Sequence, residues 1–301
     1  MKPMLASDAD LTKLQYPIII QPKCDGCRGL YLTDQFTGRS LKPHKNKALT
    51  AFYSQRCFKG LDGELFAGLD PAATDLCRKT SSVCSTIDSK VVPSFMVFDY
   101  IDEWQPAPYV IRYARAKDKV LELQEEFPSH NIQLVQSVTV YDSVGLDAWE
   151  QEWLTQGYEG VILRDAKGLY KEGRSTVKEG GLLRIKRFTD AEALVTGITE
   201  GVTNMNEAKT NELGHTERSS HQENKVPNGT VGSLLCKDLA TGAGITVGPG
   251  NMTHDLRRHY FQNQHELVGK VIKYKAFMHG VLDKPRFPTF ICIRDAEDMP
   301  Q

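Results

Sequence analysis

The chain has 301 residues, of which 40% are hydrophobic and 25% charged, and its formal net charge is -1. This composition is typical of globular proteins, and the length allows two domains. The small net charge gives no global signature of nucleic-acid binding, so any such binding must use local basic patches. No stretch approaches the roughly 18 apolar residues of a membrane span, and the acidic N-terminus is unlike a signal peptide. We therefore expect a cytoplasmic protein with no membrane partner.

Seven cysteines are scattered along the chain without the spacing of a zinc site. Cys24 and Cys27 form one CxxC pair, whose Asp25-Gly26 centre is unlike the usual apolar centre of a thioredoxin-like dithiol. We interpret the cysteines as reduced thiols, as expected in the cytosol.

A lysine, a carboxylate and an arginine surround one turn near the N-terminus. Residues 16–21 are a short β-branched apolar run, which predicts a buried strand, and a second strand is expected at 30–33. Between them lies Lys23-Cys24-Asp25-Gly26-Cys27-Arg28, in which Gly26 is expected to supply backbone freedom for a sharp turn. A lysine amine beside an arginine in a partly desolvated pocket loses its proton more readily, which makes Lys23 a candidate nucleophile. A surface turn with charges of both signs is the alternative.

Predicted strands and helices alternate up to about residue 188. Asp70-Pro71 is typical of a helix N-cap followed by proline at the first helical position. Helical periodicity covers 112–127 and 145–156, and apolar runs predict strands at 61–66, 93–100, 132–140 and 160–164. Residues 182–188 alternate in polarity, so Arg184 and Lys186 are expected to share one strand face. Two cations on one face repel each other unless an anion such as a phosphate lies there. A solvated face is the alternative.

The pattern changes after residue 188. A strand is expected at 193–198, and the polar composition of residues 201–230 predicts a long loop that is partly disordered in the free protein. Strands at 231–237, 244–247 and 268–277 and a helix near 253–263 complete the chain. Short strands around one helix are typical of a small β-barrel of the OB type. We therefore predict one domain over residues 1–188 and a second over 189–301, with the insertion at 201–230.

Three further motifs lie in or beside the predicted strands. Glu64 belongs to Leu61-Asp62-Gly63-Glu64-Leu65, Phe98 belongs to Met96-Val97-Phe98-Asp99, and Glu159 directly precedes an apolar strand. In this order, and together with the lysine motif, they resemble the covalent nucleotidyltransferase superfamily, specifically the small ATP-dependent DNA ligases of bacteriophages. The resemblance covers nearly the whole chain. It implies an α+β fold with an ATP-grasp-like nucleotidyltransferase domain followed by a C-terminal OB-fold β-barrel.

The resemblance also implies a role for each matched residue. Lys23 is the implied nucleophile, which becomes an AMP-lysine, and Arg184 and Lys186 are the catalytic phosphate-binding pair, in which the family usually has lysine at the position of Arg184. The implied nucleotide-binding residues are Gln21, Pro22, Lys23, Arg28, Arg39, Glu64, Phe98, Glu159, Arg184, Lys186 and Arg286. Glu159 and Glu64 are the implied ligands of Mg²⁺ or Mn²⁺. Arg286 lies in Lys284-Pro285-Arg286-Phe287-Pro288, which resembles the last motif of the small phage enzymes.

The implied reaction is the sealing of 5′-phosphate/3′-hydroxyl nicks in duplex DNA with ATP, by a monomer that works in the host cytoplasm if it is phage-encoded. DNA contacts are predicted at Arg39 and Lys42, which belong to the arginine motif, and at Lys273 and Lys275, which share one strand face. A solvated barrel face is the alternative for the last two. RNA ligases and mRNA-capping guanylyltransferases share the lysine motif and stay open as alternatives. A non-catalytic nick-binding protein is an alternative of another class.

Overall fold

The computed structural model describes residues 1–70, 73, 75–102, 104–277 and 284–294. The chain divides into two compact units, Met1–Lys186 and Arg187–Gln301, and each is described by itself. This division falls after Lys186, whereas the sequence placed the boundary after residue 188. None of the helices formed by the described residues combines the length and the apolar character needed to cross a lipid bilayer.

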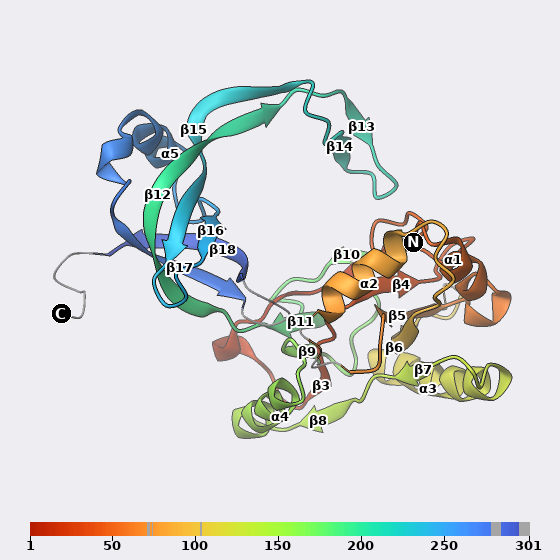
Figure 1. Cartoon of the computed structure of the whole chain (residues 1–301). Helices are drawn as coiled ribbons and strands as arrows, with labels where there is room; N and C mark the ends of the chain where they lie inside the picture. Colours follow the sequence, from red (N-terminus) through yellow and green to blue (C-terminus); the bar gives the residue numbers. More distant parts are fainter. Residues whose placement is uncertain (71–72, 74, 103, 278–283, 295–301) are drawn as a thin grey trace. The chain divides into compact units, whose positions relative to one another are not determined.

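The first unit contains two main β-sheets (Figure 1). The first sheet has the order β2 (Ser7–Asp8), β11 (Leu182–Ile185), β9 (Val161–Arg164), β3 (Ile18–Pro22), β8 (Val138–Val140). The second sheet has the order β4 (Cys27–Leu30), β5 (Leu61–Phe66), β6 (Ser94–Tyr100), β7 (Ile132–Leu134). A short parallel pair is formed by β1 (Met4–Leu5) and β10 (Gly173–Arg174).

Each sheet packs on helices through its own hydrophobic core. Helix α4 (Ser143–Thr155) packs on the first sheet, with Trp153 fully buried among aliphatic side chains of β3, β9 and β11. The second sheet shares a core rich in aromatic rings with α1 (Lys47–Tyr53), α2 (Leu76–Ser85) and α3 (Tyr109–Glu126). Two short 3₁₀ helices, η1 (Leu11–Lys13) and η2 (Arg56–Phe58), complete the unit. Each fully buried large apolar side chain contributes about 1.5–3 kcal/mol, so these cores fix both sheets firmly.

The turn of residues 23–26, here called the lysine turn, joins the two sheets, because β3 lies in the first sheet and β4 in the second. The strand expected at 30–33 is wrong, since β4 already begins at Cys27 and ends at Leu30. Gly26 is required for close packing, since a Cβ there would lie 2.1 Å from the carbonyl oxygen of Leu65. Its φ lies outside the left-handed region, so the expected need for backbone freedom is not the reason for this glycine.

Two further expectations differ from the structure. The apolar run 132–140 forms two short strands, β7 and β8, which belong to different sheets. Between them the amide of Val135 donates to the carbonyl of Val97 (2.7 Å), after which the chain leaves the second sheet. The helix expected from Asp70-Pro71 begins at Leu76, after Asp75. Pro71 lies outside the described residues.

The second unit is a five-stranded antiparallel sheet that closes on itself. Its order is β16 (Gly244–Val247), β15 (Lys225–Asp238), β12 (Thr189–Asn204), β17 (Val271–Phe277), β18 (Arg286–Ile293). The two edge strands of this order, β16 and β18, meet at a parallel bridge just after β16. There Gly248 N donates to Pro288 O (2.9 Å) and Phe290 N donates to Gly248 O (3.0 Å). Helix α5 (His254–Gln262) and η3 (Gln264–Glu266) follow β16, and α5 contacts β15. A closed five-stranded barrel with one helix is the expected OB type of architecture.

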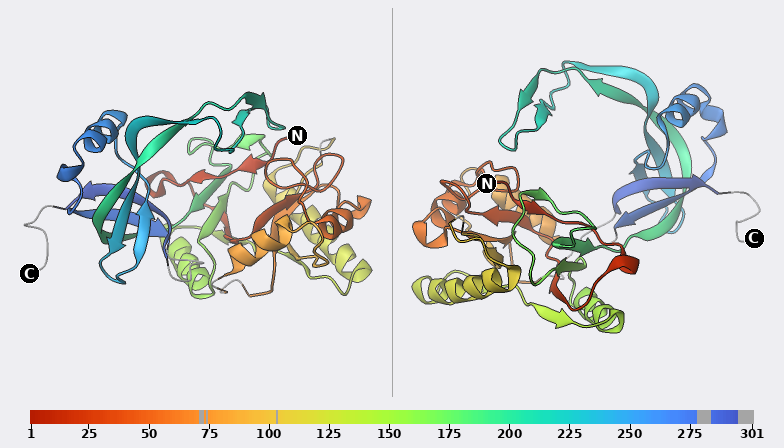
Figure 2. Two further views of the ribbon diagram at one scale, coloured as in Figure 1. Left: turned by 45° about the horizontal axis from the view of Figure 1, so that its top comes forward. Right: turned by 180° about the vertical axis from the view of Figure 1, so that it is seen from behind.

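The polar segment 201–230 is not the long loop that its composition predicts. Strands β12 and β15 remain paired as far as Asn204 opposite Lys225, and the hairpin of β13 (Ala208–Thr210) and β14 (Thr216–Arg218) forms the tip. Figures 1 and 2 show this ribbon running out from the barrel. At the base of the β13–β14 hairpin, Asn206 Nδ2 donates to Ser219 O (3.0 Å) and His221 O (2.9 Å). Composition misleads here because a two-stranded ribbon satisfies its own backbone and can expose polar side chains on both faces.

Candidate active site

Two lysines share one buried carboxylate in the first unit. Lys23 follows β3, Lys186 follows β11 and Glu159 lies just before β9. The Nζ atom of Lys23 donates to Oε2 of Glu159, and Nζ of Lys186 forms an ion pair with Oε1. The side chain of Glu159 is 3% exposed, against 20% for Lys23 and 14% for Lys186. The accessible side of the cluster therefore presents amines.

The backbone holds these three residues where β3, β9 and β11 come together. The amide of Lys23 donates to Gly160 O (2.8 Å), and the amide of Glu159 donates to Lys23 O (3.0 Å). A Cβ at Gly160 would lie 2.2 Å from the carbonyl oxygen of Ile185, so only glycine allows β11 to approach this closely. The lysines are thus mounted on rigid strand ends.

The charges around Glu159 are unbalanced. Burial opposes ionisation of Glu159, but the adjacent charges of Lys23 and Lys186 outweigh it and hold its pKa below the usual range. The pKa of Lys186 is lowered, mainly by burial and also by repulsion from Lys23, although the Glu159 carboxylate opposes the shift. Glu159 binds both amines directly, and Asp25 also acts on Lys186; a single carboxylate in contact with two amines leaves positive charge that can attract an anion such as a phosphate.

The arginine of the lysine motif lies beside an aromatic ring. Arg28 forms a bidentate pair with Asp62, with Nε donating to Oδ1 (2.5 Å) and Nη2 to Oδ2 (2.7 Å). Its guanidinium carbon lies 4.7 Å from the centre of the half-buried Phe98 ring. Because two parallel hydrogen bonds fix a guanidinium in its plane, Asp62 determines where Arg28 lies over the ring.

Glu64 interacts electrostatically with Arg28 and with Lys23. It lies on β5, and the charges of Arg28 and Lys23 act on its carboxylate. Burial raises the pKa of Glu64 to about 7, against the attraction of these two cations. Its charge therefore changes near neutral pH, and a ligand that accepts or supplies charge can shift it.

A buried ionic network lies behind Phe98. Asp99 pairs with Arg112, whose Nε donates to Oδ1 (2.8 Å), and with Arg164, whose Nη1 donates to Oδ2 (2.9 Å). All three side chains are almost completely buried. Arg164 belongs to β9 and Asp99 to β6, so the network joins the two main sheets of the first unit.

Gln21, two residues before Lys23, carries a side-chain donor without an acceptor among the described residues. Its side chain is buried on β3, and Nε2 has no hydrogen-bond partner in the described part of the chain. Pro22 ends the strand directly before Lys23. An unpaired buried donor costs about 1–3 kcal/mol, which a ligand offering an acceptor would relieve.

The predicted phosphate-contacting residues Arg39 and Lys42 are exposed on one loop. Leu41, between them, has φ 62°, a left-handed backbone that a leucine rarely adopts and that is typical of functional loops. The ring nitrogen Nε2 of His44 lies 3.1 Å from the carbonyl oxygen of Arg28. The end of the loop is thereby tied to β4.

Family models match both units of the chain. A model described as ATP dependent DNA ligase domain matches residues 3–186, and one described as DNA ligase OB-like domain matches residues 224–294. The chain belongs to the ATP-dependent DNA ligase family. The expected fold class, a nucleotidyltransferase domain followed by an OB-like domain, is confirmed.

Two named relatives align with less than a third of this chain. The DNA ligase of Escherichia phage T7 is 33% identical over 88 residues, which are 29% of this chain and 23% of the T7 protein. The DNA ligase of Enterobacteria phage T3 is 32% identical over 85 residues, which are 27% of this chain and 23% of that protein. These alignments therefore cover less than a quarter of the curated relatives.

Solved structures match over almost the whole chain. The Chlorella virus DNA ligase-adenylate is 27% identical, with a TM-score of 0.55 over 98% of this chain and 99% of that chain. A Lig E DNA ligase is 21% identical, with a TM-score of 0.72 over 98% and 99% of the two chains, and it shows a shared fold.

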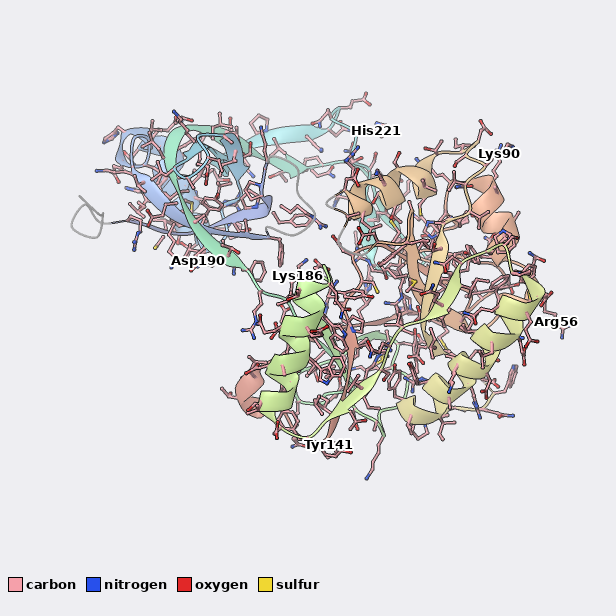
Figure 3. All side chains as sticks on the ribbon, turned by 60° about the horizontal axis from the view of Figure 1, so that its bottom comes forward. Arg56, Lys90, Tyr141, Lys186, Asp190 and His221 are labelled. Atoms are coloured by element: carbon pink, nitrogen blue, oxygen red, sulfur yellow. The ribbon has the colours of Figure 1, made fainter. Side chains whose placement is uncertain are left out.

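Several residues assigned through the family resemblance contact groups other than the Glu159 carboxylate within their own unit. Nε of Arg184 donates to Asp8 of β2 (2.6 Å), not to the carboxylate that binds Lys186. In the second unit, Lys273 pairs with Asp190 (2.8 Å), Lys275 lies 5.0 Å from the Phe188 ring centre, and Arg286 lies 5.7 Å from that of Phe287. Lys186 and Asp190 are labelled in Figure 3, on either side of the division between the units. The roles of these residues stay predictions.

The site fits a divalent cation that also binds phosphate. No three His, Cys, Asp or Glu residues gather as a metal site within the described ranges. Mg²⁺ usually takes one or two carboxylates and completes its shell with water and phosphate oxygens, so a dedicated cage is not required. The Glu159 and Glu64 carboxylates are oxygen ligands of this kind. Both Glu159 oxygens are held by lysines, which a cation must displace.

Proposed function

We propose that this protein is a DNA ligase that uses ATP to seal 5′-phosphate/3′-hydroxyl nicks in duplex DNA through a lysyl-AMP intermediate. The main support is the pair of lysines on one buried carboxylate, with Lys23 in the turn between two sheets. Such a cluster offers an amine nucleophile and a second cation for the phosphate that it attacks.

Residues around the lysine pair suit a purine nucleotide. The Phe98 ring offers a surface for base stacking, and the amide of Gln21 offers a donor and an acceptor to the edge of adenine. In its ionised form Glu64 can accept hydrogen bonds from ribose hydroxyls. Arg28, already oriented by Asp62, would accompany the base or the ribose.

In the first step Lys23 leaves Glu159, and its Nζ, after loss of its ammonium proton, attacks the α-phosphorus. A P–N bond forms, the P–O bond to the leaving group breaks, and pyrophosphate departs. Lys186 stabilises the charge that develops on the phosphate oxygens. Mg²⁺, when bound at Glu159 and Glu64, supplies Lewis-acid stabilisation of the phosphates. The AMP then passes to the 5′-phosphate of the nick, and attack by the 3′-hydroxyl releases it. Three easier substitutions thus replace one with a poor leaving group.

The proposed partner is nicked duplex DNA, bound by a monomer in the cytoplasm. Arg39 and Lys42 on their exposed loop, and Lys273 and Lys275 on β17, offer cations for backbone phosphates. Contacts of this kind carry no sequence information and weaken with salt.

The test is incubation with Mg²⁺ and α-labelled ATP or GTP, after pyrophosphate treatment to remove bound AMP, followed by denaturing electrophoresis. We expect covalent label from ATP in the native protein and in the exposed-lysine control Lys13→Ala, but none in Lys23→Ala. Sealing of a nicked DNA duplex, and not of a nicked RNA duplex, would distinguish a DNA ligase from an RNA ligase. Label from GTP would instead support a capping guanylyltransferase. Tight nick binding without label would support a non-catalytic protein.

A further inference from the structure

A second cavity of the first unit lies apart from the lysine cluster, since neither Lys23, Lys186 nor Glu159 lines it. Its volume is about 360 Å³, and its lining comes from the loop after β4, from η2, from the end of β6 and the loop after it, and from α3. Gly60 belongs to this lining with φ 92°, and a Cβ there would lie 2.8 Å from the Tyr100 ring. Glycine thus makes room for an aromatic wall. The volume is within the range of sites for small ligands.

Two cations of this lining have no partner. Arg56 and Lys59 are three residues apart at η2, and side chains with this spacing lie on one side of a 3₁₀ turn. Both are exposed, and neither forms an ion pair or a side-chain hydrogen bond within the part of the chain that the structure describes. Figure 3 labels Arg56 at the outer edge of this unit. A third cation, Lys119, pairs with Glu122 (2.7 Å), and Asp102 is the acid of the lining. The cavity therefore carries a net positive charge, which suits a ligand with phosphates.

An exposed tryptophan lies at the same cavity. Trp104 is 90% exposed, although its loop is fixed at two points. The Trp104 amide donates to Asp102 Oδ1 (3.0 Å), and Arg115 binds Gln105 through Nη1 to the carbonyl oxygen (3.3 Å) and Nη2 to Oε1 (3.2 Å). An indole is mostly buried in folded proteins, because its large apolar surface is better covered. Held in solvent on a fixed turn, the Trp104 ring is available to cover a flat aromatic ligand.

We propose that this cavity is an accessory site for single-stranded nucleic acid, in which one base stacks on Trp104 and the adjacent phosphates pair with Arg56 and Lys59. Cations beside an aromatic platform are typical of binding without sequence preference, because every base has a π face and every nucleotide a phosphate. An acidic peptide would use the cations and leave the indole without a partner. The site goes beyond the proposed function, since it binds whether or not Lys23 transfers AMP.

The experiment titrates the full chain with unphosphorylated (dT)8 and measures tryptophan fluorescence and, with a fluorescein label on the DNA, anisotropy at several salt concentrations. We expect quenching in the native protein and none in Trp104→Phe, which can still stack and should keep its affinity. Trp104→Ala should bind about 5- to 150-fold more weakly. The double variant Arg56→Ala/Lys59→Ala should reduce the slope of log affinity against log salt by about 1.4. The matched control Lys90→Ala/Lys117→Ala removes two exposed lysines outside the cavity and should keep the native slope.

Quenching that persists in Trp104→Phe, or equal affinities of the native protein and Trp104→Ala, would overturn the proposal. Equal losses of slope in the two double variants would also overturn it. Polyglutamate that competes as strongly as unlabelled (dT)8 would assign the cavity to an acidic protein segment instead, and binding of dTMP without (dT)8 would assign it to a small molecule. Because Trp104 is exposed, its variants should keep the native Tm, so lost binding reports on the site. Failure of lysine labelling with ATP would refute the proposed function and leave this site untouched.

Discussion

Replacement of Asp99 by asparagine should destabilise the first unit more than any surface change of the same kind. The side chain keeps its size but loses the charge that pairs with Arg112 and Arg164, and all three groups are buried. Arg112 would retain only carbonyl acceptors, at Ala107 (2.8 Å) and Gly168 (2.9 Å). Removing one partner of a buried ion pair costs about 3–5 kcal/mol.

For a unit of this size each 1 kcal/mol shifts Tm by about 2–4 °C, so we expect a loss of roughly 6–20 °C. Scanning calorimetry measures this shift, and the exposed helix residue Asp118 provides the control Asp118→Asn, expected to stay within about 0.5 kcal/mol. Because Arg164 also lies 5.5 Å from the Phe98 ring centre, ATP binding should weaken at temperatures where Asp99→Asn remains folded. A Tm within about 2 °C of the native value would refute the idea that this network stabilises the first unit.

Three further results are expected. Burial raises the pKa of Glu64 to about 7, so the folded protein holds this proton more tightly than the unfolded chain does. The stability of the protein without nucleotide should therefore fall as pH rises through about 7. Apparent ATP affinity should rise over the same range, and denaturation and binding titrations should lose both dependences in Glu64→Gln. Lys273→Ala and Lys275→Ala should each reduce the slope of log affinity for nicked DNA against log salt by about 0.9, and unchanged slopes in filter-binding assays would exclude phosphate contacts there. Chelation of Mg²⁺ by EDTA should abolish lysine labelling while calorimetry shows an unchanged Tm, and persistent labelling would contradict the assigned carboxylate roles.

Strong local patterns determined most of the fold prediction. Apolar runs located β3, β6 and β9 because each is buried against a core and must be apolar. The same reasoning failed at 132–140, where one run feeds two sheets, and at 201–230, where polarity hides a paired ribbon. Pairing between distant strands is a property of the fold, and no local pattern in those segments records it.

The candidate site was predicted unevenly. Single-residue roles came from motifs, and Lys23, Glu159 and Lys186 do lie together. Sequence reasoning gave no role to Asp62, Asp99 and Arg164, although the first two are acids within apolar strands. Because a buried acid needs a partner, that rule alone predicts ion pairs for both, but only the structure identifies the arginines. The partner of Arg184, Asp8, is likewise set by pairing of β11 with β2, far away in sequence.

The central claim is that Lys23 is the nucleophile, and Lys186 is its most informative competitor because it binds the same carboxylate. The most direct measurement is peptide mapping by mass spectrometry after reaction with ATP and Mg²⁺, with Lys23→Arg and Lys186→Arg in parallel. We predict one AMP on the peptide that contains Lys23, none in Lys23→Arg, and a reduced amount on the same peptide in Lys186→Arg. AMP on Lys186, or an adduct that persists in Lys23→Arg, would contradict the account.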